Sequence, residues 1–284
     1  MKKILLMGIC IMMVLTTMSC SNKEKEEKKE ESPFIWGTDY VKCDTKLPDE
    51  TEQIGFDIPF AYSCNREDFN VELITYEGKG LEQCSINVSD DSVDEWNAIT
   101  NGSYRLGLLG VVIDVKMIDA IEVDSITIKI KGKEQKLIFN EPLRFKKVKN
   151  EDDFQELLTA DIIGSDSKVV LSYKVSANDK LKIIDWYMSD PYTIQDEWIE
   201  VNDEKNSQNK KEISLKKSDE VRFHLSIVAE EKNQYNFTIF DYTIKYINKK
   251  QVEKEYIIPI VKQGVDNEES CKNVLKQLVE TNGR

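Results

Sequence analysis

The chain contains a single histidine, His224, and this limits the catalytic chemistry that it can perform. Hydrolases of the Ser-His-Asp and Cys-His types need a histidine that takes a proton from the nucleophile. His224 falls on the outward side of an alternating segment, where we expect a solvated side chain. The sequence also lacks HExxH, GxSxG, P-loop and GxGxxG motifs. We therefore predict no catalytic residue, although paired carboxylates drawn from separate strands would leave no local motif.

One acidic loop offers oxygen ligands for a metal ion. Residues 89–95 carry four carboxylates next to Trp96, namely Asp90, Asp91, Asp94 and Glu95. Hard oxygen ligands on a flexible loop suit calcium, but the EF-hand glycine and the twelve-residue spacing are missing. A calcium site is one interpretation, and a solvated acidic turn is the other. No other cofactor is predicted.

An aromatic-rich segment is the second candidate binding feature. It runs through Asp190 and Pro191 and contains Trp186, Tyr187, Tyr192 and Trp198. Exposed aromatic faces can stack on sugar rings or anchor a protein partner. The alternative is that these side chains form part of the core and its rim.

The cysteines could form disulfides. Four remain after the N-terminal segment, and they are Cys43, Cys64, Cys84 and Cys271. In an exported chain they allow two disulfides in three connectivities, and a bridge among Cys43, Cys64 and Cys84 would leave Cys271 unpaired. Four reduced, buried thiols are the alternative. No CxxC or Cys/His spacing indicates structural zinc.

The N-terminal segment has the pattern of an export signal. Lys2 and Lys3 precede an apolar run over residues 4–15, and Thr17-Met18-Ser19-Cys20 follows it. This segment resembles the signal of bacterial lipoproteins, although Thr17 and Ser19 depart from the usual lipobox residues. The resemblance implies cleavage after residue 19 and lipidation of Cys20. A plain signal peptide and a transmembrane anchor are the alternatives, but twelve apolar residues fall short of the roughly twenty that span a bilayer.

A charged segment follows Cys20. Residues 23–31 are all Lys or Glu, so residues 20–33 are predicted to be an extended tether, and the folded part begins near Phe34. Removal of Lys2 and Lys3 changes the net charge from -13 to -15. Such an acidic chain is a poor partner for nucleic acid or for anionic headgroups, so membrane attachment must come from acyl chains on Cys20.

The remainder of the chain alternates between apolar and polar residues, which is typical of strands. One such segment covers residues 54–62, and its apparent hairpin partner covers residues 69–73. The pattern recurs with a period of about 115 residues, since Pro142 aligns with Pro259 and Thr127-Ile128-Lys129 aligns with Thr243-Ile244-Lys245. Chance alignment of generic hairpins is the alternative. The predicted fold class is all-β, with two tandem immunoglobulin-like β-sandwich domains over 34–148 and 149–284.

Two helices are predicted in the second half. Residues 150–153 could cap a short helix through Leu158, and Asp266 with Glu269 resembles a capping box at the C-terminal helix. The apolar face of the C-terminal helix consists of Cys271, Val274, Leu275 and Leu278. We expect this helix to dock on the second domain, to which it belongs in the sequence.

These features lead to one functional hypothesis and one alternative. We expect a lipid-anchored protein on the extracytoplasmic face of the cell membrane, acting as a non-enzymatic binding or adhesion module for an envelope protein or glycan. The alternative is a surface hydrolase or its accessory subunit, which would need a cleft lined by converging carboxylates. A solute-binding receptor would need a parallel sheet wrapped by helices, and the sequence pattern does not favour it.

Overall fold

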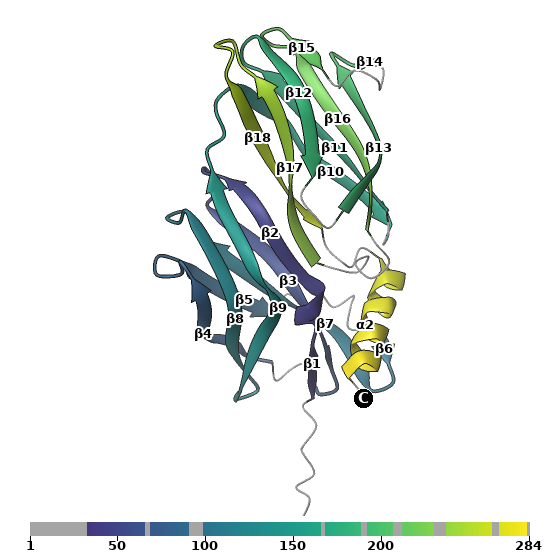
Figure 1. Cartoon of the computed structure of the whole chain (residues 1–284). Coiled ribbons are helices and arrows are strands. Elements are labelled where there is room, and N and C mark those ends of the chain that lie inside the picture. The colour runs from purple at the N-terminus through teal and green to yellow at the C-terminus, as the bar shows by residue number, and fades with distance from the viewer. Residues whose placement is uncertain are drawn as a thin grey trace, which may run out of the picture. The chain divides into compact units, whose positions relative to one another are not determined.

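The first half of the folded chain is built from two face-to-face sheets (Figure 1). The computed structural model describes residues 33–65, 69–90, 99–165, 168–188, 192–206, 212–229, 237–262 and 267–282. One sheet has the order β1-β3-β7-β5, with β6 paired to β7. These strands are β1 (Phe34–Trp36), β3 (Gln53–Tyr62), β5 (Ser85–Asp90), β6 (Thr100–Asn101) and β7 (Tyr104–Asp114). The facing strands have the order β4-β8-β9-β2, and they are β2 (Val41–Pro48), β4 (Val71–Lys79), β8 (Ala120–Ile130) and β9 (Lys133–Val148). A 3-10 turn, η2 (Thr38–Tyr40), separates β1 from β2.

The second half is also a sandwich. Its first sheet has the order β10-β11-β16-β13-β14. These strands are β10 (Phe154–Ser165), β11 (Lys168–Ala177), β13 (Tyr192–Val201), β14 (Glu204–Asn206) and β16 (Glu220–Ala229). The facing strands have the order β15-β12-β17, with β18 on the other side of β17, and they are β12 (Leu181–Met188), β15 (Ile213–Leu215), β17 (Phe237–Ile247) and β18 (Glu253–Lys262).

The two halves repeat one strand order. The path β1-β3-β7-β5 corresponds to β10-β11-β16-β13, and β4-β8-β9 corresponds to β12-β17-β18. Four strands facing three in this connectivity is the immunoglobulin constant-type arrangement. The predicted all-β, immunoglobulin-like fold is therefore confirmed, as is the repeated order of strands. Residues 34–284 form one compact unit, so the independence of the two predicted domains stays a prediction.

The predicted hairpin after residue 62 is wrong. β3 pairs with β1 and β7, whereas β4 pairs with β8 in the facing sheet. Alternation identifies the buried face of a strand, but it contains no information about which strand lies beside it. The chain between β3 and β4 therefore crosses from one sheet to the other.

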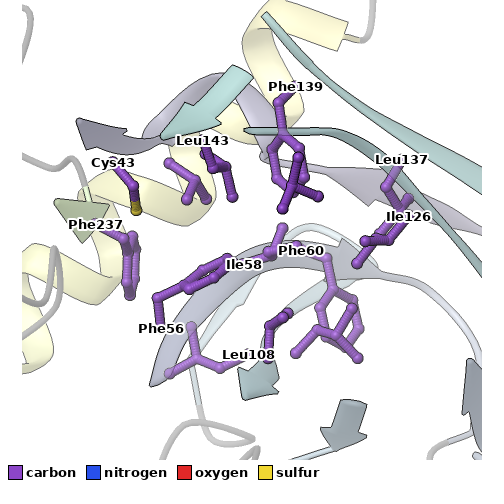
Figure 2. Close-up of a cluster of buried hydrophobic side chains, with 14 of the residues drawn as sticks. Cys43, Phe56, Ile58, Phe60, Leu108, Ile126, Leu137, Phe139, Leu143 and Phe237 are labelled. Atoms are coloured by element: carbon purple, nitrogen blue, oxygen red, sulfur yellow. The ribbon is translucent and has the colours of Figure 1, made fainter. Parts of the chain in front are cut away.

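A parallel pairing joins the two sandwiches. Strand β2 pairs with β9 over its C-terminal part and with β17 over Val41–Cys43, which makes one eight-stranded sheet. The first residues of β17 enter the first core, where Figure 2 shows Phe237 together with Cys43 and Phe56. Asp241 of β17 is 3% exposed and accepts a hydrogen bond of 3.0 Å from the Lys46 amide of β2.

The helix predicted after residue 150 is wrong, because that segment leads into strand β10. The Asn150 side chain both donates to the carbonyl oxygen and accepts from the amide of Ile257, each at 2.9 Å, as a neighbouring strand would. Asp153 accepts a hydrogen bond of 2.9 Å from the Tyr246 hydroxyl, and burial raises the Tyr246 pKa. The polar residues therefore bind the second sandwich instead of capping a helix.

The C-terminal helix α2 (Glu268–Asn282) has the predicted apolar face. Cys271, Val274, Leu275 and Leu278 are fully buried. Its cap is Asn267, which accepts from the Ser270 amide at 2.9 Å, while Asp266 lies outside the described residues. No helix in the described part of the chain is long and apolar enough to cross a bilayer.

The expected docking site of α2 is wrong. Its apolar face joins the core of the first sandwich and contacts β1, β3, β6 and β7 (Figure 1). The reason is visible in the buried strands, since consecutive residues of β3 and β7 are buried on both faces of the sheet. An apolar outer face of this sheet needs a cover, and α2 supplies it.

All four cysteines of the folded part are free thiols, so none of the expected disulfides is present. Cys43, Cys84 and Cys271 are buried, and Cys64 is half-buried. Burial raises the pKa of the Cys84 thiol to about 11 and also raises that of Cys43. The buried thiols act as small apolar side chains.

Among the four cysteines of the folded part, we predict that Cys64 alone reacts rapidly with iodoacetamide in the native protein at about pH 8. The thiolate is the nucleophile, and with a pKa of about 11 the Cys84 thiolate fraction is about one thousandth. Peptide mass spectrometry after timed labelling would measure each rate, with labelling in denaturant as the control. Disulfide-linked peptides in the unreduced protein would contradict the structure.

We predict that Leu275→Ala lowers the free energy of unfolding by about 2–5 kcal/mol, because the helix side chain leaves a cavity in the first core. Lys276→Ala is the matched control, since Lys276 is exposed and its Nζ lies 4.0 Å from Glu280. Denaturant titration of the full chain would measure both values. Equal effects of the two substitutions would show that α2 does not dock on this sheet.

Candidate functional site

The candidate calcium loop lies mostly outside the described residues. Asp91, Asp94 and Glu95 belong to the part that the structure does not describe, and Asp90 ends β5 opposite Leu109 of β7. Within the described ranges, no group of three or more His, Cys, Asp or Glu side chains could hold a metal ion. The calcium site at residues 90–95 stays a prediction.

Trp186 and Tyr187 are neighbours on β12 and point to opposite faces. The Trp186 ring lies 6.4 Å from the Phe223 ring of the facing sheet, and its Nε1 donates a 2.7 Å hydrogen bond to Glu197 Oε2. The Tyr187 hydroxyl donates to Glu255 Oε1 at 3.1 Å on the outer face. Trp186 is therefore a rim residue of the second core, as the alternative interpretation expected.

A shallow hollow of about 580 Å³ lies where β12 and β13 face each other at the open edge of the second sandwich. Its lining comprises Trp186, Tyr187, Met188, Thr193, Ile194, Gln195, Asp196 and Glu197. The lining combines an aromatic edge with the carboxylates of β13. Sequence reasoning found the two aromatic residues but missed Glu197, because only the pairing of β13 with β16 brings it opposite β12.

Trp198 is separated from this hollow. It lies opposite His224 on the outer face of the β13–β16 pair, and the two rings stack at 4.5 Å with an interplanar angle of 8°. The Tyr192 backbone pairs with Ala229, and its side chain lies outside the described residues. The aromatic residues therefore divide between two surfaces and do not form one platform.

His224 points outward, as predicted, but it is not solvated. Only 14% of its side chain is exposed, and its Nε2 lies 3.2 Å from Glu200 Oε2. The two side chains are therefore close, but Nε2 makes no hydrogen bond. The expectation failed because Trp198 covers the imidazole from the neighbouring strand. No signal in the sequence pairs these two residues.

A second hollow, of about 320 Å³, lies on the first sandwich between the turn after β4 and strands β8 and β9. Charged residues line it, and they already pair with one another. Lys79 Nζ lies 2.8 Å from Glu122, and Arg144 lies 3.7 Å from the same carboxylate. The hydrogen bond raises the Lys79 pKa and lowers the Glu122 pKa. This arrangement is an exposed ion-pair network.

Comparisons with known proteins return structural neighbours only. No protein-family model and no curated protein matches the chain. The collagen adhesin of S. aureus is 9% identical, with a TM-score of 0.27, over 79% of this chain and 94% of that chain. The major pilin subunit of Bacillus cereus is 9% identical, with a TM-score of 0.27, over 63% of each chain. The yeast GGA1 GAE domain is 12% identical, with a TM-score of 0.24, over 38% of this chain and 97% of that chain. At these identities and TM-scores, no ligand, partner or site residue of these proteins can be assigned to this chain.

Proposed function

We propose that this protein is a lipid-anchored cell-envelope module that binds a protein or glycan ligand without catalysing a reaction. The observation that carries the proposal is the N-terminal segment. A basic start, an apolar run and Thr17-Met18-Ser19-Cys20 are followed by a fully charged stretch. That order suits export, acylation of Cys20 and display of a folded body by an extended tether.

In the folded part, the carboxylates that line the two hollows bind neighbouring side chains, and this supports a binding role. Glu197 holds the Trp186 indole, and Glu122 pairs with Lys79 and Arg144. These carboxylates position neighbouring side chains and do not converge across a cleft. A pair of glycosidase carboxyls would instead face each other across about 5–10 Å of open site. Two sandwiches with exposed sheet faces and loops offer surface for recognition.

We predict that the full chain incorporates radiolabelled palmitate in bacterial cells and that Cys20→Ala abolishes the label and the membrane association. Two acyl chains hold a protein stably at a bilayer, whereas the acidic chain has no electrostatic attraction to anionic lipids. Fractionation and autoradiography would measure both effects. Cys10→Ala is the matched control, because Cys10 lies within the apolar run and outside the lipobox. Membrane association that persists in Cys20→Ala would refute the anchor.

Capture from envelope extracts tests the binding half of the proposal. Immobilised full chain should retain an envelope protein or glycan at micromolar or better affinity. A chain that retains neither, and that instead cleaves envelope polymers, would favour the hydrolase alternative.

A further inference from the structure

The sheet containing β11, β16 and β13 (Figure 1) carries mostly polar residues at the outer positions of these three strands. Its centre is the β16 row, which we define as Arg222, His224 and Ser226. These residues alternate with buried Phe223 and Leu225, so all three point to the outer face. Their cross-strand neighbours are Lys174, Ser172 and Val170 on β11 and Glu200, Trp198 and Asp196 on β13.

Each member of the β16 row has a buried polar atom that makes no hydrogen bond, although His224 Nε2 lies 3.2 Å from Glu200 Oε2. Arg222 Nε, His224 Nε2 and Ser226 Oγ are all buried, and none makes a hydrogen bond. Ser226 is only 4% exposed as a residue. A buried polar group without a hydrogen bond costs about 1–3 kcal/mol, and most such groups in folded proteins are satisfied by protein or water. Three such atoms in one row indicate that a bound molecule supplies the missing hydrogen bonds at this surface.

The residues that flank the β16 row indicate which class of ligand would supply these hydrogen bonds. Trp198 contributes an aromatic ring that stands beside His224. Lys174 and Arg222 contribute two cations to this face. Glu200 and Asp196 on β13 and Glu220 on β16 contribute three carboxylates, and Lys174 pairs with Glu220. The face therefore offers donors, acceptors and one ring, with charges of both signs.

We propose that this face binds a neutral oligosaccharide, with its hydroxyl groups on the β16 row and a sugar ring against Trp198. A sugar hydroxyl donates and accepts, so one ligand can satisfy Arg222 Nε, His224 Nε2 and Ser226 Oγ. The inference rests on the proposed function and selects a glycan over a protein as the ligand. Because the three atoms are buried, a neighbouring side chain must change rotamer on binding, as is common at interfaces.

Two other ligand classes fit less well. The centre of a protein interface is usually apolar and poor in charge, whereas the exposed large hydrophobic residues of the described chain all lie elsewhere, and they are Ile74, Met117, Ile138, Val252 and Val261. An anionic ligand would approach a chain with a net charge of -13. A neutral glycan avoids both problems, and its affinity should not depend on salt.

The test uses the full chain in detergent micelles on a printed panel of oligosaccharides. Neutral members contain glucose, mannose, galactose or N-acetylglucosamine, and acidic members contain uronate or sulfate. We expect retention by at least one neutral oligosaccharide, with less than twofold change in Kd when salt rises from about 50 to about 500 mM. Trp198→Ala and Ser226→Ala should each weaken binding about tenfold.

Ser226→Ala also separates binding from folding. Removal of an unsatisfied hydroxyl should leave Tm unchanged or higher, because no bond in the free protein is lost. Ser214→Ala is the matched control, since Ser214 is exposed on β15 of the opposite sheet, and its Kd should stay within twofold.

Three outcomes would overturn the inference. These are no retention by a neutral oligosaccharide, binding confined to acidic members, or affinities that Trp198→Ala and Ser226→Ala leave unchanged. Capture of an envelope protein by all of these variants would refute the glycan assignment while leaving the proposed binding function standing. Failure of the unchanged chain to incorporate palmitate would contradict the lipid anchor but would not affect the glycan assignment.

Discussion

The parallel pairing of β2 with β17 is the constraint on which the arrangement of the two sandwiches depends. Parallel strands are stable where both of their faces are covered. Val41 and Cys43 of β2 are each 4% exposed, and Phe237 and Ile239 of β17 are 2% and 1% exposed. Strand β17 therefore begins in the first core and continues into the second. One strand belongs to both hydrophobic cores, so the sandwiches cannot separate without exposing apolar surface.

A buried carboxylate fixes the register of this pairing. Asp241 accepts hydrogen bonds from the Lys46 amide and the Thr243 hydroxyl, each at 3.0 Å. A shift of one residue would turn Asp241 toward the opposite face and would leave a buried charge without donors. Lys46 Nζ also lies 3.3 Å from Glu255 on β18. Apolar contacts hold the two halves together, and this polar contact determines how they align.

Local periodicity predicted most of the strands, but it did not predict which strands pair or where the C-terminal helix docks. Residues such as Phe223 and Leu225 alternate with polar neighbours because one face of their sheet is buried, and that pattern is visible in a single sequence. Partners are set by distant strands, so the pairing of β4 with β8 was missed. The docking of α2 was also missed, because the apolar stripe of a helix does not identify the surface that it covers. At the candidate site, the aromatic residues were visible, whereas their contacts with Glu197 and His224 required the fold.

The repeated strand order allows a direct comparison of two equivalent outer faces. In the first sandwich, β7 is buried on both faces from Leu106 to Val111, and α2 lies against it. In the second, the equivalent strand β16 carries Arg222, His224 and Ser226 at its outer positions. The inner residues of both strands are apolar, because successive side chains of a strand point to opposite faces. The core therefore does not require the outer residues of β7 and β16 to differ. A face that only had to be solvated would expose its polar atoms to water, whereas this row buries three of them without hydrogen bonds. The proposed glycan face therefore occupies the outer positions of β16, and α2 covers the equivalent strand β7 in the first sandwich.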